Sequence, residues 1–332
     1  MSPSIPKQSP SKYRWLRWIG TAISLLLFLR LLARQDWGEV WLKLRLIPAW
    51  VLPLALGLYF IGMVANALRW YVLLQPPKIR LSFWETSKIV FMGAFISNFL
   101  PSTIGGDAAR ALSLLRSDAD RAASLASILL DRIMNVSAFF TVLPLSVITF
   151  GSPAVLFNEL THHTGRPLWL ALGALGMGSG GWRAKARRWL LRSLETFRIW
   201  LKEPAYLAGA FVVSWFSIFV IFVAIWLLAL GLGIQVKLYQ VMGVTGITYL
   251  LTLLPISING FGLREIAITT LYARLGASLE QAATLAMITR FMAMTVTLPG
   301  ALWVSKVASG PGQAQATQSD VQNAQDIGDK LV

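Results

Sequence analysis

Nine apolar segments, each near the length of a membrane span, limit what this chain can fold into. A helix needs about 20 apolar residues to cross a bilayer. The first segment, Trp15 to Leu32, lacks the small-residue cleavage site of a signal peptide and is expected to stay as an anchor. The others lie at residues 49–74, 85–101, 121–150, 167–181, 204–233, 239–256, 261–276 and 281–305. With 55% apolar and 14% charged residues, the sequence predicts an all-α, polytopic helical membrane protein and excludes an ordinary water-soluble one.

The charge of the chain is strongly positive. Thirty Lys and Arg residues stand against fifteen Asp and Glu, which gives a formal net charge of +15. We expect an anionic partner, and phospholipid headgroups suit a membrane protein best. Nucleic acid is the competing partner, but domains that bind it do not carry repeated apolar spans. The lack of cysteine excludes disulfides, thiolate metal sites and cysteine nucleophiles.

The Lys and Arg residues predict the orientation of the spans, because short loops rich in them stay in the cytoplasm. The polar N-terminus, residues 1–14, and the start of the first span carry four basic residues, which places this end inside. The connection at 182–203 carries seven basic residues against two acidic ones, so it is also inside. Only an even number of crossings separates two cytoplasmic points. We therefore expect six crossings and two re-entrant helix pairs, the first broken at Pro101, with eight full spans as the alternative.

Two polar segments adjoin the membrane domain, which is expected to cover residues 15–306. The connection at 182–203 has apolar residues at helical spacing, Trp200 among them. It is either a basic amphipathic interfacial helix, with its Trp residues at the headgroup level, or a charged loop that only fixes topology. Residues 307–332 are polar and are expected to form a disordered C-terminal tail.

An internal repeat links two of these apolar segments. Leu-Pro-Ser-Thr-Ile-Gly-Gly at 100–106 resembles Leu-Pro-Ile-Ser-Ile-Asn-Gly at 254–260. An Arg follows nine residues after the Pro in both copies, as Arg110 and Arg264. Since Pro, Ile, Gly and Arg keep the same register, we interpret the two stretches as copies of one unit.

A second similarity lies downstream, where Arg132-Ile-Met resembles Arg290-Phe-Met in the final span. A Pro followed by a Gly-rich turn breaks a helix and frees backbone groups, which a membrane tolerates only where they line a polar cavity or are buried in protein. Broken helices at matching positions of two halves indicate a transporter-type binding site. The expected topology gives the two pairs opposite orientations, which predicts inverted repeats.

Charged residues inside the apolar segments indicate a partner or a function, because each costs about 2.5 to 3.5 kcal/mol at the centre of a transmembrane helix. Helix neighbours point about 100° apart, so adjacent charges are expected to pair with other segments. Arg69 lies near the end of its span and is expected to snorkel. The candidate substrate-binding residues are Asn98, Pro101, Gly106, Asp107, Arg110, Asp131, Arg132, Pro255, Asn259, Gly260, Arg264, Glu265 and Arg290.

Arg outnumbers acid among these buried charges, by five to three when Arg69 is included. Guanidinium groups stay charged when buried and bind phosphate oxygens in a bidentate way. We expect two or more of them to hold a lipid phosphate, while carboxylates orient them or bind a cationic group. The Arg residues expected in this role are Arg110, Arg132 and Arg290, and the carboxylates are Asp107 and Glu265.

Motifs of enzyme chemistry are missing from the sequence. It has no Gly-rich loop ending in Gly-Lys-Ser or Gly-Lys-Thr, no Gly-x-Ser-x-Gly and no His-Glu-x-x-His. The adjacent His162 and His163 lack the i, i+4 spacing of two metal ligands on one helix face. We therefore expect no ATP hydrolysis, no cofactor, no metal and no enzymatic activity.

The stretch Ser97 to Arg110, the pair Asp131-Arg132 and the stretch Pro255 to Glu265 together resemble the lysylphosphatidylglycerol synthase transmembrane region family. Its members are flippase-like integral membrane proteins, and the resemblance covers about residues 15–306. It implies a unit that moves lipids across the bilayer. In bifunctional members a separate soluble domain attaches an amino acid to phosphatidylglycerol, and we expect the translocation unit here without that chemistry. Relatives are associated with polyprenyl-phosphate sugars, hopanoids and glycolipids, so the cargo does not follow from the fold.

These features predict a multi-pass lipid translocator of the bacterial cytoplasmic membrane, which carries a phosphate-containing lipid between leaflets without ATP. Its partner would be an anionic phospholipid or a polyprenyl-phosphate lipid. Two other classes stay open. One is an intramembrane transferase that uses Asp107 or Glu265 as an acid or base on a lipid-linked donor. The other is a non-catalytic partner of a lipid-modifying enzyme encoded elsewhere.

Overall fold

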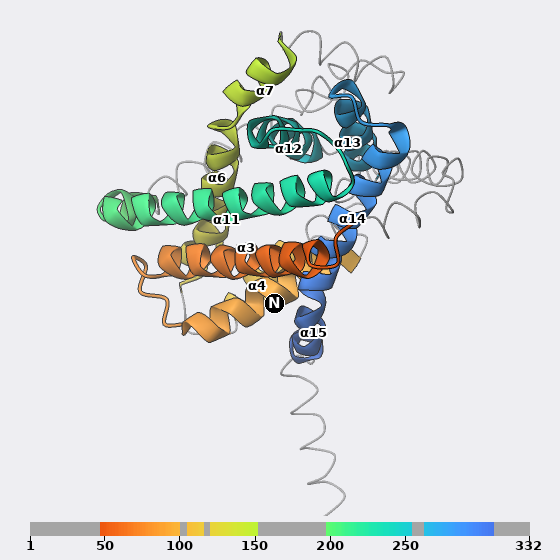
Figure 1. The fold of residues 1–332 in the computed structure, drawn as a ribbon. Helices are drawn as coiled ribbons and strands as arrows, with labels where there is room; N and C mark the ends of the chain where they lie inside the picture. Colours follow the sequence, from red (N-terminus) through yellow and green to blue (C-terminus); the bar gives the residue numbers. More distant parts are fainter. Residues whose placement is uncertain (1–46, 100–104, 116–119, 152–196, 254–261, 309–332) are drawn as a thin grey trace, which may run out of the picture.

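The computed structural model of the chain describes residues 47–99, 105–115, 120–151, 197–253 and 262–308 (Figure 1). Throughout these ranges the regular structure is helical, as predicted, and strands are absent. The helices are α3 (Val51–Leu74), α4 (Phe83–Phe99), α5 (Gly105–Leu115), α6 (Arg121–Phe140), α7 (Leu143–Phe150), α11 (Pro204–Gly231), α12 (Leu238–Leu253), α13 (Leu263–Arg274), α14 (Leu279–Thr297) and α15 (Ala301–Ala308), with the 3-10 turn η2 (Leu298–Gly300) before the last.

Local sequence signals set several helix starts. The Ser278 hydroxyl accepts a hydrogen bond from the Gln281 N–H, and the Gln281 side chain accepts one from the Ser278 N–H in return. This capping box begins α14. Asp120 caps α6 by accepting from the Ala122 N–H at 2.9 Å. Pro204 opens α11, at a helix position where its missing N–H costs nothing.

Four helical stretches are long and apolar enough to cross a bilayer. They are Val51–Leu74, Arg121–Phe150, Pro204–Gly231 and Leu279–Val304. Each coincides with one of the six predicted crossings. The other two predicted crossings, at residues 16–32 and 167–181, lie outside the described residues. The prediction of a polytopic helical membrane protein is therefore confirmed.

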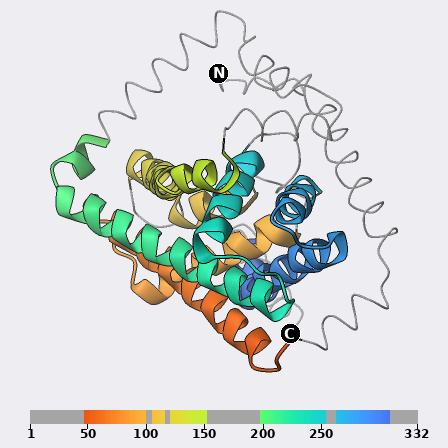
Figure 2. The ribbon, with the colours of Figure 1, turned by 45° about the horizontal axis from the view of Figure 1, so that its top comes forward.

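Helices α3 and α11 lie side by side (Figures 1 and 2). Gly62 of α3 allows this close contact, since a Cβ there would lie 3.0 Å from the Cγ1 of Ile221. The Ser217 hydroxyl of α11 donates to the Gly62 carbonyl at 3.0 Å. Elsewhere α11 exposes large apolar side chains such as Val212 and Phe216. Contact with lipid makes such a surface stable, as expected for a membrane span.

The first predicted broken pair corresponds to α4 and α5, which flank residues 100–104 and pack against each other. Their backbones touch at two glycines. A Cβ on Gly106 would collide with the Gly93 carbonyl, and a Cβ on Gly93 would lie 3.0 Å from the Gly106 carbonyl. Gly106, expected at the binding site, therefore has a packing role in the structure, because no side chain fits between these helices.

Helices α12 and α13 form the second pair and flank residues 254–261. They also pack against each other, with Leu251 of α12 in one buried cluster with Leu263 and Ala267 of α13. The helices of each pair thus meet as the sequence predicts. The inverted orientation of the two pairs and the orientation of the chain in the membrane stay predictions.

Several predictions fall outside the described residues. These positions are Pro101, Pro255, Asn259 and Gly260, the N-terminus 1–14, residues 182–196 and residues 309–332 of the predicted tail. The first two residues of that tail, 307 and 308, form the end of α15.

Trp200, predicted to lie at the headgroup level, faces protein in the structure. Residues 197–201 are helical, and the Trp200 side chain is buried. Its indole N–H donates to the Leu73 carbonyl at 2.8 Å, and the ring lies in a cluster with Leu130 and Ala210. At this position the helix therefore faces protein, because the indole finds both its apolar contacts and its acceptor there.

Candidate functional site

Two ion pairs join α5 to α6. Asp107 and Arg110 lie three residues apart on α5 and so share a face of the helix. Arg132 donates to the Asp107 Oδ2 from Nε at 3.0 Å and from Nη2 at 2.8 Å. Arg110 donates from Nη1 to the Asp131 Oδ2 at 3.0 Å. The first pair is partly exposed, with 48% of the Arg132 side chain and 28% of the Asp107 side chain accessible, whereas the second is buried.

Asp131 also binds a second arginine. Arg69 of α3 donates from Nε to the Asp131 Oδ1 at 2.7 Å and from Nη1 to the Asn135 Oδ1 at 2.9 Å. Only 4% of Arg69 is exposed, so the expected snorkelling to the interface is wrong. A carboxylate on the neighbouring helix lies within reach, and pairing with it compensates the burial of the guanidinium. One carboxylate thus serves two arginines, which leaves this cluster with a net positive charge.

Arg110 has a second neighbour in Trp70. Its guanidinium lies over the indole ring, 5.1 Å from the ring centroid. A cation at this distance is attracted by the negative face of the ring. Arg110 is therefore held from two sides, by the Asp131 carboxylate and by the Trp70 face.

The second broken pair contributes Glu265, which is 1% exposed. Its Oε2 accepts from the Gly262 N–H at 2.9 Å in the first turn of α13. Its Oε1 accepts from the Arg290 Nε at 2.8 Å and lies 2.7 Å from Nη2. Glu265 thus satisfies a free backbone N–H at the start of α13 and neutralises a buried arginine of α14.

The two halves of the chain build this ion pair in the same way. Asp107 and Glu265 each lie in the first turn of the helix that follows a break. Their partners Arg132 and Arg290 lie 25 residues further on, each on a later long helix. The similarity between Arg132-Ile-Met and Arg290-Phe-Met therefore has a structural counterpart.

Arg264 has no carboxylate within ion-pair distance among the described residues. Its nearest polar partner there is Thr289 of α14, whose Oγ1 lies 3.4 Å from Nη2. Thr289 occupies the position before Arg290, as Asp131 occupies the position before Arg132. The second half therefore has a hydroxyl where the first half has a carboxylate.

Arg264 and Thr289 line a cavity of about 160 Å³. We call it the Arg264 cavity. Its polar lining consists of Tyr59, Thr245, Thr248, Tyr249, Thr252, Arg264, Tyr272 and Thr289. Three of the hydroxyls, those of Tyr59, Thr248 and Tyr272, are buried without a hydrogen-bond partner in the part of the chain that is described. A buried polar group in this state costs about 1 to 3 kcal/mol, so the feature calls for an explanation.

A chain of hydrogen bonds connects the Arg264 cavity to Arg110. Tyr249 lines the cavity, and its hydroxyl accepts from the Asn135 Nδ2 at 2.7 Å. Asn135 in turn accepts from Arg69, which shares Asp131 with Arg110. The two broken helix pairs are thereby linked through α6 and α3.

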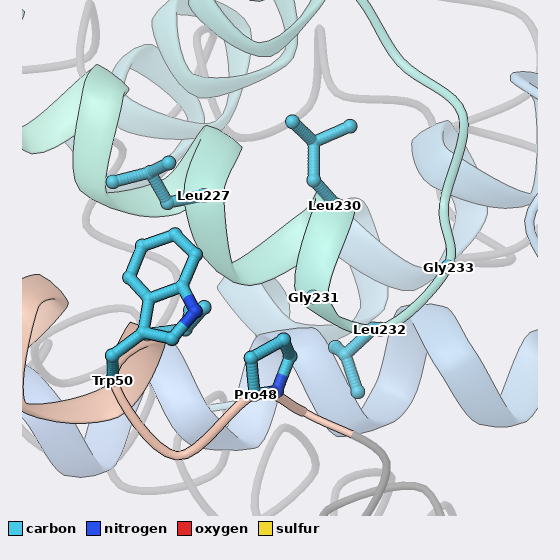
Figure 3. Close-up of a pocket in the computed structure, with 8 residues that line it drawn as sticks. Pro48, Trp50, Leu227, Leu230, Gly231, Leu232 and Gly233 are labelled. Carbon is cyan, nitrogen blue, oxygen red and sulfur yellow. The ribbon is translucent and has the colours of Figure 1, made fainter.

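A larger depression lies elsewhere, where the start of α3 meets the end of α11 (Figure 3). It has a volume of about 500 Å³ and is lined mostly by apolar groups, including Pro48, Trp50 and Leu230. No residue predicted for the site lines it. By volume alone this depression would be the better candidate for a binding site. The buried charges and the hydroxyls without a partner instead favour the Arg264 cavity.

The structure places the other predicted residues as follows. Asp107, Arg110, Asp131 and Arg132 form one group, and Arg264, Glu265 and Arg290 form a second. The Asn98 Nδ2 donates to the Thr297 Oγ1 at 3.2 Å. Of the adjacent charges, Asp131, Arg132 and Glu265 pair with other segments as expected, whereas Arg264 meets only the Thr289 hydroxyl among the described residues.

Sequence reasoning missed several members of these groups. Trp70, Asn135, Tyr249 and Thr289 are neutral and fit an apolar span, so no cost of burial marks them. The repeat offered one usable signal, because aligning Arg132 with Arg290 also aligns Asp131 with Thr289.

These helices and buried ion pairs define the chain as a polytopic helical membrane protein with two groups of charges inside its helical bundle. The chain belongs to the family described as the lysylphosphatidylglycerol synthase TM region, which matches residues 17–300. The resemblance found in the sequence is thus confirmed. A comparison with curated proteins found no match. Membership of the family associates the protein with lipid modification or transport in a membrane.

Proposed function

We propose that this protein translocates a phosphate-containing lipid, or a lipid-linked intermediate, between the leaflets of a bacterial cytoplasmic membrane without hydrolysing ATP. The cargo would be an anionic phospholipid or a polyprenyl-phosphate lipid. The family supports a membrane-lipid context, and the chemistry of the buried charges supports a phosphate group as the part that is recognised.

The surplus of buried guanidinium groups carries this proposal. Asp131 is shared by Arg69 and Arg110, and Arg264 meets no carboxylate in the described ranges. Each uncompensated charge inside a membrane protein is costly, so it implies a bound counter-charge or a function. A guanidinium binds phosphate oxygens in the same bidentate way as it binds a carboxylate.

Buried polar groups would lower the barrier to translocation. A headgroup that leaves water loses its hydration, which is the main cost of moving it through hydrocarbon. Guanidinium groups and hydroxyls along the path replace part of that hydration, while the acyl chains stay in lipid. This equilibration needs no covalent step and no nucleotide.

The Asp107–Arg132 pair suits the role of entry site. It is partly exposed, and an exposed ion pair contributes only about 0 to 1 kcal/mol. A lipid phosphate can therefore replace the Asp107 carboxylate on Arg132 at little cost. The Glu265–Arg290 pair is buried, and Glu265 also caps α13, so exchange there is expected to be far less favourable.

Lipid scrambling by the purified protein in liposomes tests the proposal, with fluorescent phosphatidylglycerol and a labelled polyprenyl phosphate as cargo. Arg110→Ala is the informative variant, because Asp131 keeps its bond to Arg69 and folding should survive. We expect the variant to slow movement of one label by about tenfold or more, the effect of one lost charged hydrogen bond. Arg80→Ala removes an exposed arginine outside both groups and serves as the matched control.

Absence of movement of either label with folded wild-type protein would refute translocation of these lipids. Equal rates in wild type and Arg110→Ala would remove Arg110 from the path. The lipids recovered after the assay should also be chemically unchanged. A modified product would instead favour the transferase hypothesis.

A further inference from the structure

We infer that the Arg264 cavity is a binding site for a single phosphate group, distinct from the Asp107–Arg132 pair. The natural occupant follows from the proposed function and is the phosphate of a translocated lipid. Free inorganic phosphate presents the same tetrahedral oxyanion, so the experiment separates the two sources.

The charge of the cavity favours an anion. Among the described residues Arg264 is the only charged one that lines it, and none of them contributes a carboxylate. The neighbouring Glu265 is occupied by the Gly262 N–H and by Arg290. Arg264, Tyr59 and Tyr272 all line this cavity, so the cation and the two hydroxyls face the same space.

The free hydroxyls favour a ligand with several acceptor atoms. Those of Tyr59 on α3, Thr248 on α12 and Tyr272 on α13 are buried and have no partner among the described atoms. All three come from different helices and line the same cavity. A hydroxyl can rotate to donate its proton to an oxyanion. A phosphate oxygen offers each of them the acceptor that the protein does not provide.

The size of the cavity favours a single phosphate group over a whole lipid headgroup. Its 160 Å³ equals the liquid volume of roughly five waters, at about 30 Å³ each. Pockets for drug-sized ligands start at about 300 Å³. A phosphate with its ester oxygens therefore matches this volume better than a sugar joined to a phosphate. A neutral ligand group that carries a hydroxyl would also fit by size, but it would leave Arg264 without a counter-charge.

Isothermal titration of the full chain in detergent tests this site directly. The probes are inorganic phosphate, dihexanoyl phosphatidic acid and dihexanoylglycerol, which lacks the phosphate. We expect binding of the phosphate probes, no binding of dihexanoylglycerol, and an affinity lowered by about tenfold to a hundredfold in Arg264→Gln. Arg274→Gln, which removes an exposed arginine from the same helix, should bind as the wild type does.

Preference between the two phosphate probes identifies the source. Binding of phosphatidic acid at least as tight as that of inorganic phosphate supports a lipid phosphate, and binding of inorganic phosphate alone supports a free ion. Either result supports the site. Failure of both probes to bind folded wild-type protein would overturn it, as would an unchanged affinity in Arg264→Gln.

Tyr59→Phe and Tyr272→Phe keep the inference testable if Arg264→Gln does not fold. Each removes one hydroxyl that has no protein partner in the described structure, so without phosphate the variants should melt at or above the wild-type temperature. Phosphate should raise their melting temperature less than it raises that of the wild type. An equal rise in both variants would contradict the inference. Phosphate binding without scrambling would refute only the proposed function, and scrambling without phosphate binding would refute only this site.

Discussion

The Asp107–Arg132 and Glu265–Arg290 pairs share a plan and differ in environment. Each places an acid in the first turn after a helix break and an arginine 25 residues later. The first pair is partly exposed, whereas the second is buried and its acid also caps a helix. The comparison teaches that the same spacing in the sequence gives the same acid–arginine pairing but ion pairs of different stability. Burial decides how readily a ligand can replace the acid on its arginine.

Arg110 and Arg264, which lie beside these pairs, also differ in their partners. Arg110 and Arg264 each follow nine residues after a proline, but they take different positions in their helices. Arg110 is the sixth residue of α5, whereas Arg264 is the second residue of α13. Residues 100–104 separate α4 from α5, whereas residues 254–262 separate α12 from α13, which accounts for the difference. Arg110 consequently meets Asp131, and Arg264 meets Thr289. In the first half the charge of Arg110 is partly compensated by a carboxylate. In the second half the charge of Arg264 faces a cavity.

The largest expected effect comes from removing the shared carboxylate. Asp131→Ala leaves Arg69 and Arg110 buried without a counter-charge and should destabilise the fold by about 3 to 5 kcal/mol. Thr289→Ala, at the matching position, should cost within about 1 kcal/mol. Unfolding in detergent, followed by circular dichroism, measures both. Similar losses in the two variants would mean that the two halves do not differ in the way described.

The next effect separates the two acid–arginine pairs themselves. Glu265→Gln keeps the shape of the side chain but leaves Arg290 buried without its counter-charge, which should cost about 3 kcal/mol. Asp107→Asn affects a partly exposed pair and should cost no more than about 1 kcal/mol. The same unfolding assay applies. If Asp107→Asn were the more harmful substitution, burial would not be what distinguishes the pairs.

A carboxylate can also be added to the second half. Thr289→Asp should give Arg264 the partner that Arg110 has in Asp131, without loss of stability. Phosphate affinity, measured by titration, should fall by about tenfold, because the new carboxylate competes for the guanidinium. Thr289→Asn provides the uncharged control and should retain more of the affinity. A variant that still binds phosphate as the wild type does would place the anion away from Arg264.

The smallest effect concerns the link between the halves. Tyr249→Phe removes the acceptor of the Asn135 amide and should destabilise the protein by about 1 kcal/mol. The Phe139 ring, stacked on Tyr249 at 3.8 Å, should hold the new side chain in place. Thermal unfolding detects the change. A loss as large as that of Asp131→Ala would show that the hydrogen-bonded chain acts as one unit.

Much of the fold could be predicted from the sequence, because membrane spans depend on length and apolar content alone. The stretches 49–74, 121–150, 204–233 and 281–305 contain the four long apolar helical stretches of the described residues, and α4 and α12 end directly before the Pro-containing motifs. Which faces of these helices meet could not be predicted. Spans that are apolar on all sides, such as α11, have no periodicity that marks the buried side.

The candidate site was predictable only where charge made it costly. Asp107, Asp131, Glu265 and Arg290 stand out because a charged residue in an apolar segment needs a partner. The partners themselves depend on helix packing, which the sequence does not encode locally. Arg69 illustrates this limit, because its place near a span end suggests the interface while α6 supplies a carboxylate in the interior.

The glycine contacts of α4 have a mechanical consequence. On one side Gly106 of α5 touches the Gly93 backbone, and on another a Cβ on Gly300 of η2 would collide with the Phe91 carbonyl. Contacts made by backbone alone contain no side chain that could adjust to a shift, so sliding one helix along another would drive a neighbouring Cβ into a carbonyl. We therefore expect helices α4 and α5 and the η2 turn to move together rather than slide past one another. Between α5 and α6 the Asp107–Arg132 pair is partly exposed and the Arg110–Asp131 pair is buried, so we expect any movement of this unit to break the exposed pair first.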